Sequence, residues 1–269
     1  MGDDETAARE VHPRRHRIRL NLGGARLVVP GRSRAAGAAR RKGPVVRRRT
    51  KVLVGVGAGL VVLGGAAVLV GPGLYADHVN RAAADVPTLA SSDAPLGDPA
   101  SLDGTWEVAA GSVAGYRVHE VLRGEDATVT GRTDQVTGQV TVEGGSLTAG
   151  TVRVDVASIH TDEPPRDAYF RGSVMEVGTF PTAEFTVTDP ARLTAGTTEV
   201  DLTGRLTVHG VARDVEVPAQ VAAGDGGVQV VGSVPVTFAD YGVTPPSLGF
   251  VSVDDHGAVE FSLRLERSS

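Results

Sequence analysis

The stretch AVEFSLRLE, residues 258–266, decides the fold class of this chain. Apolar residues stand at every second position, and the residues between them are charged or hydroxylated. Because successive side chains of a β-strand point to opposite faces, this alternation predicts a strand with one buried and one solvated face. The same period recurs in residues 151–158, 199–209 and 214–221 and, more weakly, in 112–122, 127–133, 138–143, 183–188 and 228–238.

Turn-forming pairs such as Gly144-Gly145 and Asp189-Pro190 separate these segments. Only residues 162–178 have a helical or irregular pattern. Eight or nine strands with almost no helix predict an antiparallel barrel or sandwich. An eight-stranded barrel is either filled by its own side chains or holds one small ligand. The strand pattern by itself leaves barrel and sandwich open.

Charge divides the 269 residues into unequal parts. Residues 1–51 hold 15 Lys and Arg against four acidic residues, a net charge of +11, whereas the rest carries 12 basic and 28 acidic residues, a net charge of −16. Residues 52–70, between them, contain no charged side chain and would, as a helix, cross most of a bilayer core. We therefore predict a basic tail at 1–51, a transmembrane helix at 52–74, a linker at 75–103 and a β-domain at 104–267.

Basic residues cluster in residues 40–51, directly before the apolar run. At a similar distance after the run, Arg81 is the only basic residue. The positive-inside rule places residues 1–51 in the cytoplasm and the β-domain outside, as in a single-pass cell-membrane protein. A cleaved signal peptide is the alternative, but 51 residues precede the run and the run is longer than a signal sequence needs. The Gly55/Gly59 spacing allows a homodimer contact.

The composition of the tail and the linker predicts little folded structure in either. The tail is rich in Arg, Gly and Ala, so we expect it to be disordered. It has no Phe, Tyr or Trp on which bases could stack, so we expect it to contact anionic lipid rather than nucleic acid. Residues 82–104 are small and polar with three prolines, which is typical of a semi-extended tether.

Catalytic and metal-binding patterns are missing from the sequence. The absence of cysteine excludes a disulfide scaffold, a Cys-ligated zinc site and a cysteine nucleophile. No G-x-S-x-G, H-E-x-x-H, P-loop or EF-hand pattern occurs, and the four histidines of the β-domain are widely scattered. We expect no enzyme, no cofactor and no metal. Arg166 and Asp167, with Arg171 nearby, are a candidate Arg–carboxylate pair that clamps the irregular segment.

Seven short stretches resemble the YceI-like family in their order and spacing. They are GTWEV (104–108), YRVH (116–119), VDVASI (154–159), RDAYFR (166–171), FPTAEF (180–185), LTVHGV (206–211) and YGV (241–243). Members of this family are lipocalin-like barrels that bind polyisoprenoids or related amphiphilic lipids, and they are often periplasmic or fused to membrane segments. The resemblance thus implies an all-β, eight-stranded antiparallel barrel in a bacterial envelope protein.

Two positions depart from the family pattern. Val174 and Met175 stand where an aromatic pair is common, and Tyr116 replaces a phenylalanine. Both changes would reshape a cavity without removing it.

The resemblance also implies a set of ligand-binding residues. The residues expected to line the lumen or its mouth are Tyr116, Val118, Val154, Val156, Phe170, Phe185, Val187, Leu206, Val236, Phe238, Tyr241, Phe261 and Leu263, with Phe180 beside the mouth. Arg166 or Arg171 is expected to meet a phosphate or other head group. The alternative is an envelope interaction module whose barrel is filled by its own side chains, and the volume of the lumen distinguishes the two.

Overall fold

Antiparallel strands make up most of the computed structural model, which describes residues 71–90, 93–224, 227–247 and 249–269. The strands are β1 (Gly104–Val108), β2 (Val113–Leu122), β3 (Glu125–Thr133), β4 (Val136–Glu143), β5 (Ser146–Asp155), β6 (Thr182–Val187), β7 (Ala191–Arg192), β8 (Glu199–Val208), β9 (Val211–Gly224), β10 (Gly227–Thr237) and β11 (Val251–Arg267). The helical segments are α2 (Pro72–Ala82), η1 (Pro99–Leu102), η2 (Val156–Ser158), α3 (Pro164–Tyr169), η3 (Phe170–Val174) and η4 (Phe238–Tyr241).

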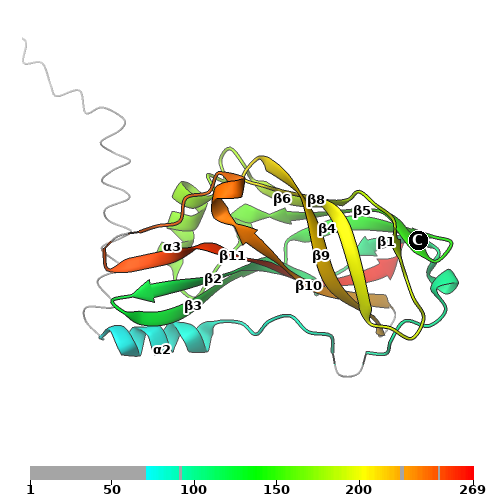
Figure 1. The fold of residues 1–269 in the computed structure, drawn as a ribbon, viewed down its shortest axis with the longest axis horizontal. Coiled ribbons are helices and arrows are strands. Elements are labelled where there is room, and N and C mark those ends of the chain that lie inside the picture. Colours follow the sequence, from blue (N-terminus) through cyan, green and yellow to red (C-terminus); the bar gives the residue numbers. More distant parts are fainter. Residues whose placement is uncertain (1–70, 91–92, 225–226, 248) are drawn as a thin grey trace, which may run out of the picture. The chain divides into compact units, whose positions relative to one another are not determined.

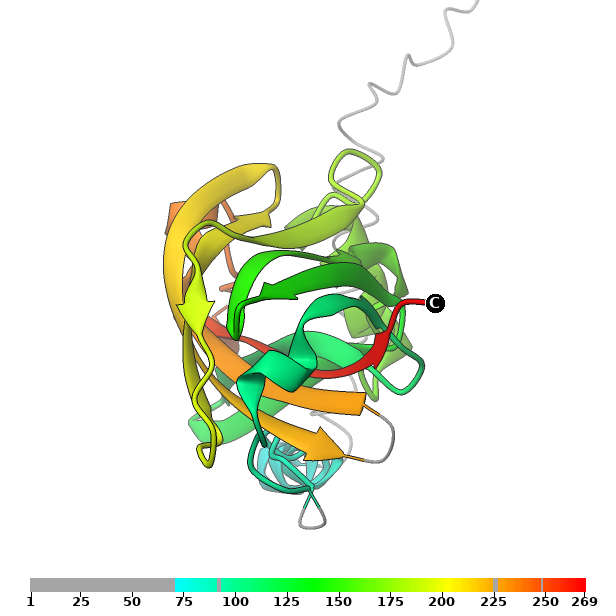
Figure 2. The same ribbon diagram turned by 90° about the vertical axis from the view of Figure 1, so that its right-hand side faces the viewer.

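Eight strands close into a ring in the order β1-β4-β5-β6-β8-β9-β10-β11. The ring closes because β11 pairs with β1 as well as with β10. Figure 2 shows these strands arranged around a common axis. The predicted eight-stranded antiparallel barrel is therefore confirmed.

The strand β11, at 17 residues, also carries the β2–β3 hairpin. Its first part, up to Ser262, pairs with β2, and its last residues pair with β1. The hairpin thereby extends the sheet beyond the ring, with β3 bound only to β2 among the strands (Figure 1). Strands β1 and β7 were not predicted, because five and two residues are too few to establish an alternating pattern.

Residues 75–90 and 93–103, the described part of the predicted linker, contact the barrel at several points. Helix α2 lies against β3 and buries Tyr75, Ala76 and Val79. Farther along, Ala94 forms an antiparallel bridge with Ala223 of β9, and Leu96 is 2% exposed in the main core. The tether prediction is wrong because these few apolar residues, though dispersed among polar ones, each pack against the barrel.

A buried carboxylate helps to fix this segment to the outside of the barrel. Glu260 of β11 is 1% exposed and pairs with Arg117 of β2, whose Nε donates to Glu260 Oε1 at 2.7 Å, and with Arg132 of β3. The Nη2 of Arg117 also donates to the carbonyl of Ala84 at 2.6 Å. The charged cluster therefore joins three strands to the chain that leaves α2.

Among residues 71–90, 93–224, 227–247 and 249–269, no helix is both long enough and apolar enough to cross a membrane. The predicted tail, residues 1–51, lies outside the described residues, and so does the predicted transmembrane helix as far as residue 70. Its last residues, 72–74, belong to α2.

Candidate functional site

The barrel encloses a cavity of about 340 Å³. Nearly all of the side chains around it are apolar, and the charged residues in its wall are Glu120, Arg166 and Glu184. Strands from around the ring contribute to the wall, together with α2, α3, η3 and η4. The volume lies within the range of small-molecule sites, roughly 300–1,000 Å³.

The thirteen apolar and aromatic residues predicted to line the lumen or its mouth all belong to this wall. They are Tyr116, Val118, Val154, Val156, Phe170, Phe185, Val187, Leu206, Val236, Phe238, Tyr241, Phe261 and Leu263. The two departures from the family pattern, Val174 and Met175, are there as well. That these residues contact a ligand stays a prediction.

Aromatic rings in the wall lie over glycines of neighbouring strands. A Cβ atom at Gly131 would meet the ring of Tyr116, and one at Gly232 would meet the ring of Phe261. Each glycine is the direct antiparallel partner of its aromatic residue. Tyr116 also stacks on Phe170 of η3, with ring centroids 4.9 Å apart. The absence of a side chain at these glycines therefore gives the rings room against the wall.

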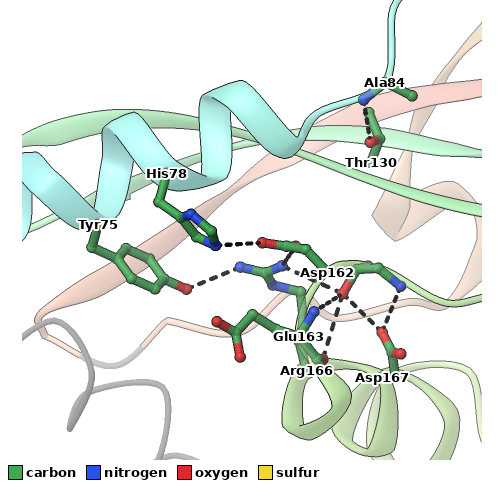
Figure 3. A network of polar contacts seen from close by, with 9 residues as sticks. Tyr75, His78, Ala84, Thr130, Asp162, Glu163, Arg166 and Asp167 are labelled. Atoms are coloured by element: carbon green, nitrogen blue, oxygen red, sulfur yellow. Dashed lines mark hydrogen bonds and ion pairs between the residues drawn. The ribbon is translucent and has the colours of Figure 1, made fainter.

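Polar side chains of α2, of α3 and of the residues just before α3 form one network of contacts (Figure 3), and two of them, Tyr75 and Arg166, border the cavity. Arg166, 9% exposed, donates from Nη2 to the Tyr75 hydroxyl at 3.0 Å and from Nη1 to Asp162 Oδ1 at 2.6 Å. Asp167 does not pair with Arg166, but accepts from the amide and hydroxyl of Thr161 at 2.9 and 2.8 Å.

The prediction that Arg166 pairs with Asp167 is therefore wrong, because Arg166 pairs with Asp162 instead. Asp162 lies two residues before α3 begins, whereas Asp167 accepts from Thr161.

A carboxyl group that the sequence analysis missed lies in the same wall. Glu120 is 7% exposed, and its burial raises its pKa, against the opposing effect of Arg166. Burial acts to lower the pKa of Arg166, but Tyr75, Glu120 and Asp162 outweigh it, so the pKa is raised and the guanidinium stays charged. The strand period contains the signal for Glu120, because it follows Tyr116 and Val118 at every second position of β2.

Arg171 and Phe180 lie outside the cavity wall. Arg171 Nη1 donates to the carbonyl of Ile159 at 3.2 Å. Phe180 packs edge-on against His209, with ring centroids 4.5 Å apart. Of the two arginines predicted to meet a head group, only Arg166 borders the cavity.

Three side chains near α2 and α3 have the chemistry of metal ligands. His78, Asp162 and Glu163 each bring a ligand atom within 4.8 Å of the others, and His78 Nε2 is 3.9 Å from Asp162 Oδ2. Asp162 is already bonded to Arg166, whose positive charge opposes a cation at this position.

Comparisons with known proteins agree with this architecture. A family model described as the YceI-like domain matches residues 106–265. A UPF0312 protein of Vibrio vulnificus is 29% identical over 136 residues, which cover 47% of this chain and 70% of that protein.

Two solved structures are also similar to this chain. Burkholderia cenocepacia BcnA is 22% identical, with a TM-score of 0.46, over 55% of this chain and 95% of that one. A polyisoprenoid-binding domain from Saccharophagus degradans is 16% identical, with a TM-score of 0.48, over 61% of this chain and 98% of that one. Helix α2 precedes the matched domain. Because the family match spans more than half of the 269 residues, this chain belongs to the YceI-like family.

Proposed function

We propose that this protein holds an isoprenoid, a fatty acid or a similar amphiphilic lipid in its barrel, outside the cytoplasm, while residues 52–70 tether it to the membrane. The observation that carries the proposal is an apolar cavity of about 340 Å³ whose wall holds the interacting polar side chains of Tyr75, Glu120 and Arg166. That arrangement suits a ligand with an apolar chain and a polar head. The polyisoprenoid-binding domain from Saccharophagus degradans is consistent with this ligand class.

Binding of this kind needs no covalent chemistry. Moving an apolar chain from water into an apolar lumen is favourable by about 0.8 kcal/mol for each buried methylene. The head would meet Arg166 and Glu120 in the cavity wall. Arg166 already donates to Tyr75 and Asp162, so the head meets a paired guanidinium rather than an isolated positive charge.

The alternative function, an interaction module with a filled barrel, is less well supported by the structure. A lumen packed by its own side chains would leave no room for a ligand, whereas a cavity is present among the described residues. Its wall also contains a buried carboxyl group, Glu120, which a purely structural core would tend to exclude.

Adjacent residues of β10 offer a matched test of lipid binding. Val236 borders the cavity, whereas Thr237 is exposed. Val236→Phe should fill part of the lumen and weaken binding of a fluorescent fatty acid such as cis-parinaric acid at least tenfold, while Thr237→Phe should leave binding unchanged. Equal affinity of both variants and the unaltered chain would reject the lumen as the binding site.

The tether is tested separately from the ligand. Alkaline extraction of membranes should leave the full-length chain in the pellet and release a chain that lacks residues 1–70. Release of both chains would contradict the proposed membrane anchor.

A further inference from the structure

We propose that α2 is a movable cover over the polar end of the cavity, that Tyr75 belongs to the ligand site, and that the ligand enters where α2 now lies. This inference rests on the proposed lipid-binding function. It concerns residues 72–82, which lie before the YceI-like match at 106–265.

Helix α2 supplies part of the cavity wall. Tyr75 borders the cavity together with Leu122, Val129 and Val251 of the hairpin and β11. These residues are between 1% and 9% exposed while α2 is in place. Removing α2 would therefore open this end of the cavity to water.

The packing of α2 is separate from the main core of the barrel. Tyr75, Ala76 and Val79 belong to a small cluster with Leu122, Ala127, Val129 and Val251. The larger cluster, which contains most of the barrel interior, shares with it only the partly buried Tyr116. Lifting α2 would thus disturb the small cluster and leave the core of the barrel intact.

A few polar contacts fasten α2 to the hairpin and to the α3 region. Besides the bond between Arg166 and Tyr75, His78 Nε2 lies 3.9 Å from Asp162, and the Asn80 side chain accepts from the Thr128 amide at 2.7 Å. A helix of 11 residues is marginal by itself, so its position depends on these contacts and on the small cluster.

The chain that follows α2 forms a fixed point about which the helix can move. Ala83 ends the helix in an extended conformation. The next residue, Ala84, is fixed by two hydrogen bonds. Its amide donates to Thr130 Oγ1 at 2.9 Å, and its carbonyl accepts from Arg117. A hinge at Ala83 would therefore free α2 without releasing the rest of the segment.

At the opposite end of the barrel, the covering residues Leu96 and Leu102 pack into the main core cluster. Leu102 borders the cavity there, and its carbonyl accepts from Trp106 Nε1 at 2.8 Å. Leu96 is buried in the main core beside it. A ligand would consequently pass at the α2 end, where its head group lies next to Tyr75, Glu120 and Arg166.

Hydrogen exchange tests the movement of α2 without any ligand. In the full-length chain, amides of α2 should exchange at least about a hundredfold faster than those in the paired centres of β8 and β9, because they open without global unfolding. Exchange of α2 at the same rate as β8 and β9 would overturn the proposal.

A reversible lock tests the route of the ligand. Because the chain has no cysteine, Asn80→Cys with Thr128→Cys introduces a single pair that can join α2 to β3. Oxidation should slow exchange of bound cis-parinaric acid at least tenfold, and reduction of the same sample should restore it. Equal rates in both states would overturn the proposed entrance. If the unlocked chain binds neither this probe nor isoprenoid alcohols, the proposed function is rejected instead. Hydrogen exchange would still test whether α2 moves as a cover.

Tyr75→Phe tests the fastening directly. Loss of the hydroxyl removes a hydrogen bond to a charged group, so dissociation of cis-parinaric acid should become about tenfold faster. Leu74→Ala is the matched control, since Leu74 lies on the same helix but is exposed and does not border the cavity. An unchanged rate in Tyr75→Phe, or an equal increase in both variants, would contradict the role of Tyr75.

Discussion

Arg166 in α3 donates a hydrogen bond of 3.0 Å to the hydroxyl of Tyr75 in α2, a residue 91 positions earlier in the chain. The bond joins a segment outside the matched family domain to the charged end of the cavity. It indicates that the folded unit begins well before residue 104. A chain shortened close to that residue should therefore lose stability.

A chain that begins at residue 71 should be more stable than one that begins at residue 100. The shorter chain loses Tyr75, Val79 and Leu96, each nearly buried, and leaves their partners exposed to water. We expect its melting temperature to fall by on the order of 5–10 °C and its binding of an apolar dye to rise. Equal melting temperatures would show that residues 71–99 contribute nothing to the fold.

Replacing Glu260 should be among the most destabilising single changes on the outside of the barrel. Glu260→Gln leaves Arg117 and Arg132 without their buried carboxylate, which we expect to cost about 3–5 kcal/mol of the free energy of unfolding. Glu184→Gln breaks the more exposed pair with Arg153 and should cost less than about 1 kcal/mol. Urea unfolding measures both, and similar values for the two variants would contradict this account.

The buried Glu120 should make stability depend on pH. Burial raises its pKa in the folded state, so the folded protein binds more protons than the unfolded chain between the ordinary carboxyl pKa and the raised one. Stability from this group is therefore lost as pH rises through that window. Glu120→Gln cannot ionise, so its stability relative to the unaltered chain should increase from pH 4 to pH 8. A constant difference in urea unfolding across this range would reject the assignment.

The Phe261 ring lies so close to Gly232 that replacing this glycine should destabilise the fold. A methyl group at Gly232 would meet the Phe261 ring, so Gly232→Ala should cost about 1–3 kcal/mol through overpacking. Gly97→Ala is the control, because nothing lies within 4 Å of the added atom there. If thermal unfolding shows the same small effect at both positions, the packing of the Phe261 ring does not require glycine at position 232.

Strand alternation predicted a barrel or a sandwich and the family resemblance favoured the barrel, but the local pattern did not reveal what covers it. In β8, Val200, Leu202 and Leu206 are buried as their spacing indicates. By contrast, α2 buries only Tyr75, Ala76 and Val79, too few to give a helical period. Their burial depends on contacts with a hairpin some 50 residues away, which no short window of sequence contains.

The polar end of the site was predictable in part. The spacing in β2 places Glu120 on the same face as Tyr116 and Val118, so attention to polar as well as apolar residues would have found it. The bond between Arg166 and Tyr75 was not predictable, because it requires knowing that α2 lies beside α3.

Native mass spectrometry of the full-length chain, followed by extraction and identification of any lipid, shows whether the barrel holds a ligand. We expect a prenyl or acyl species bound at one per chain, lost in Val236→Phe and retained in Thr237→Phe. A chain that is empty as purified, and that also takes up neither added isoprenoids nor fatty acids, would contradict the lipid-binding function.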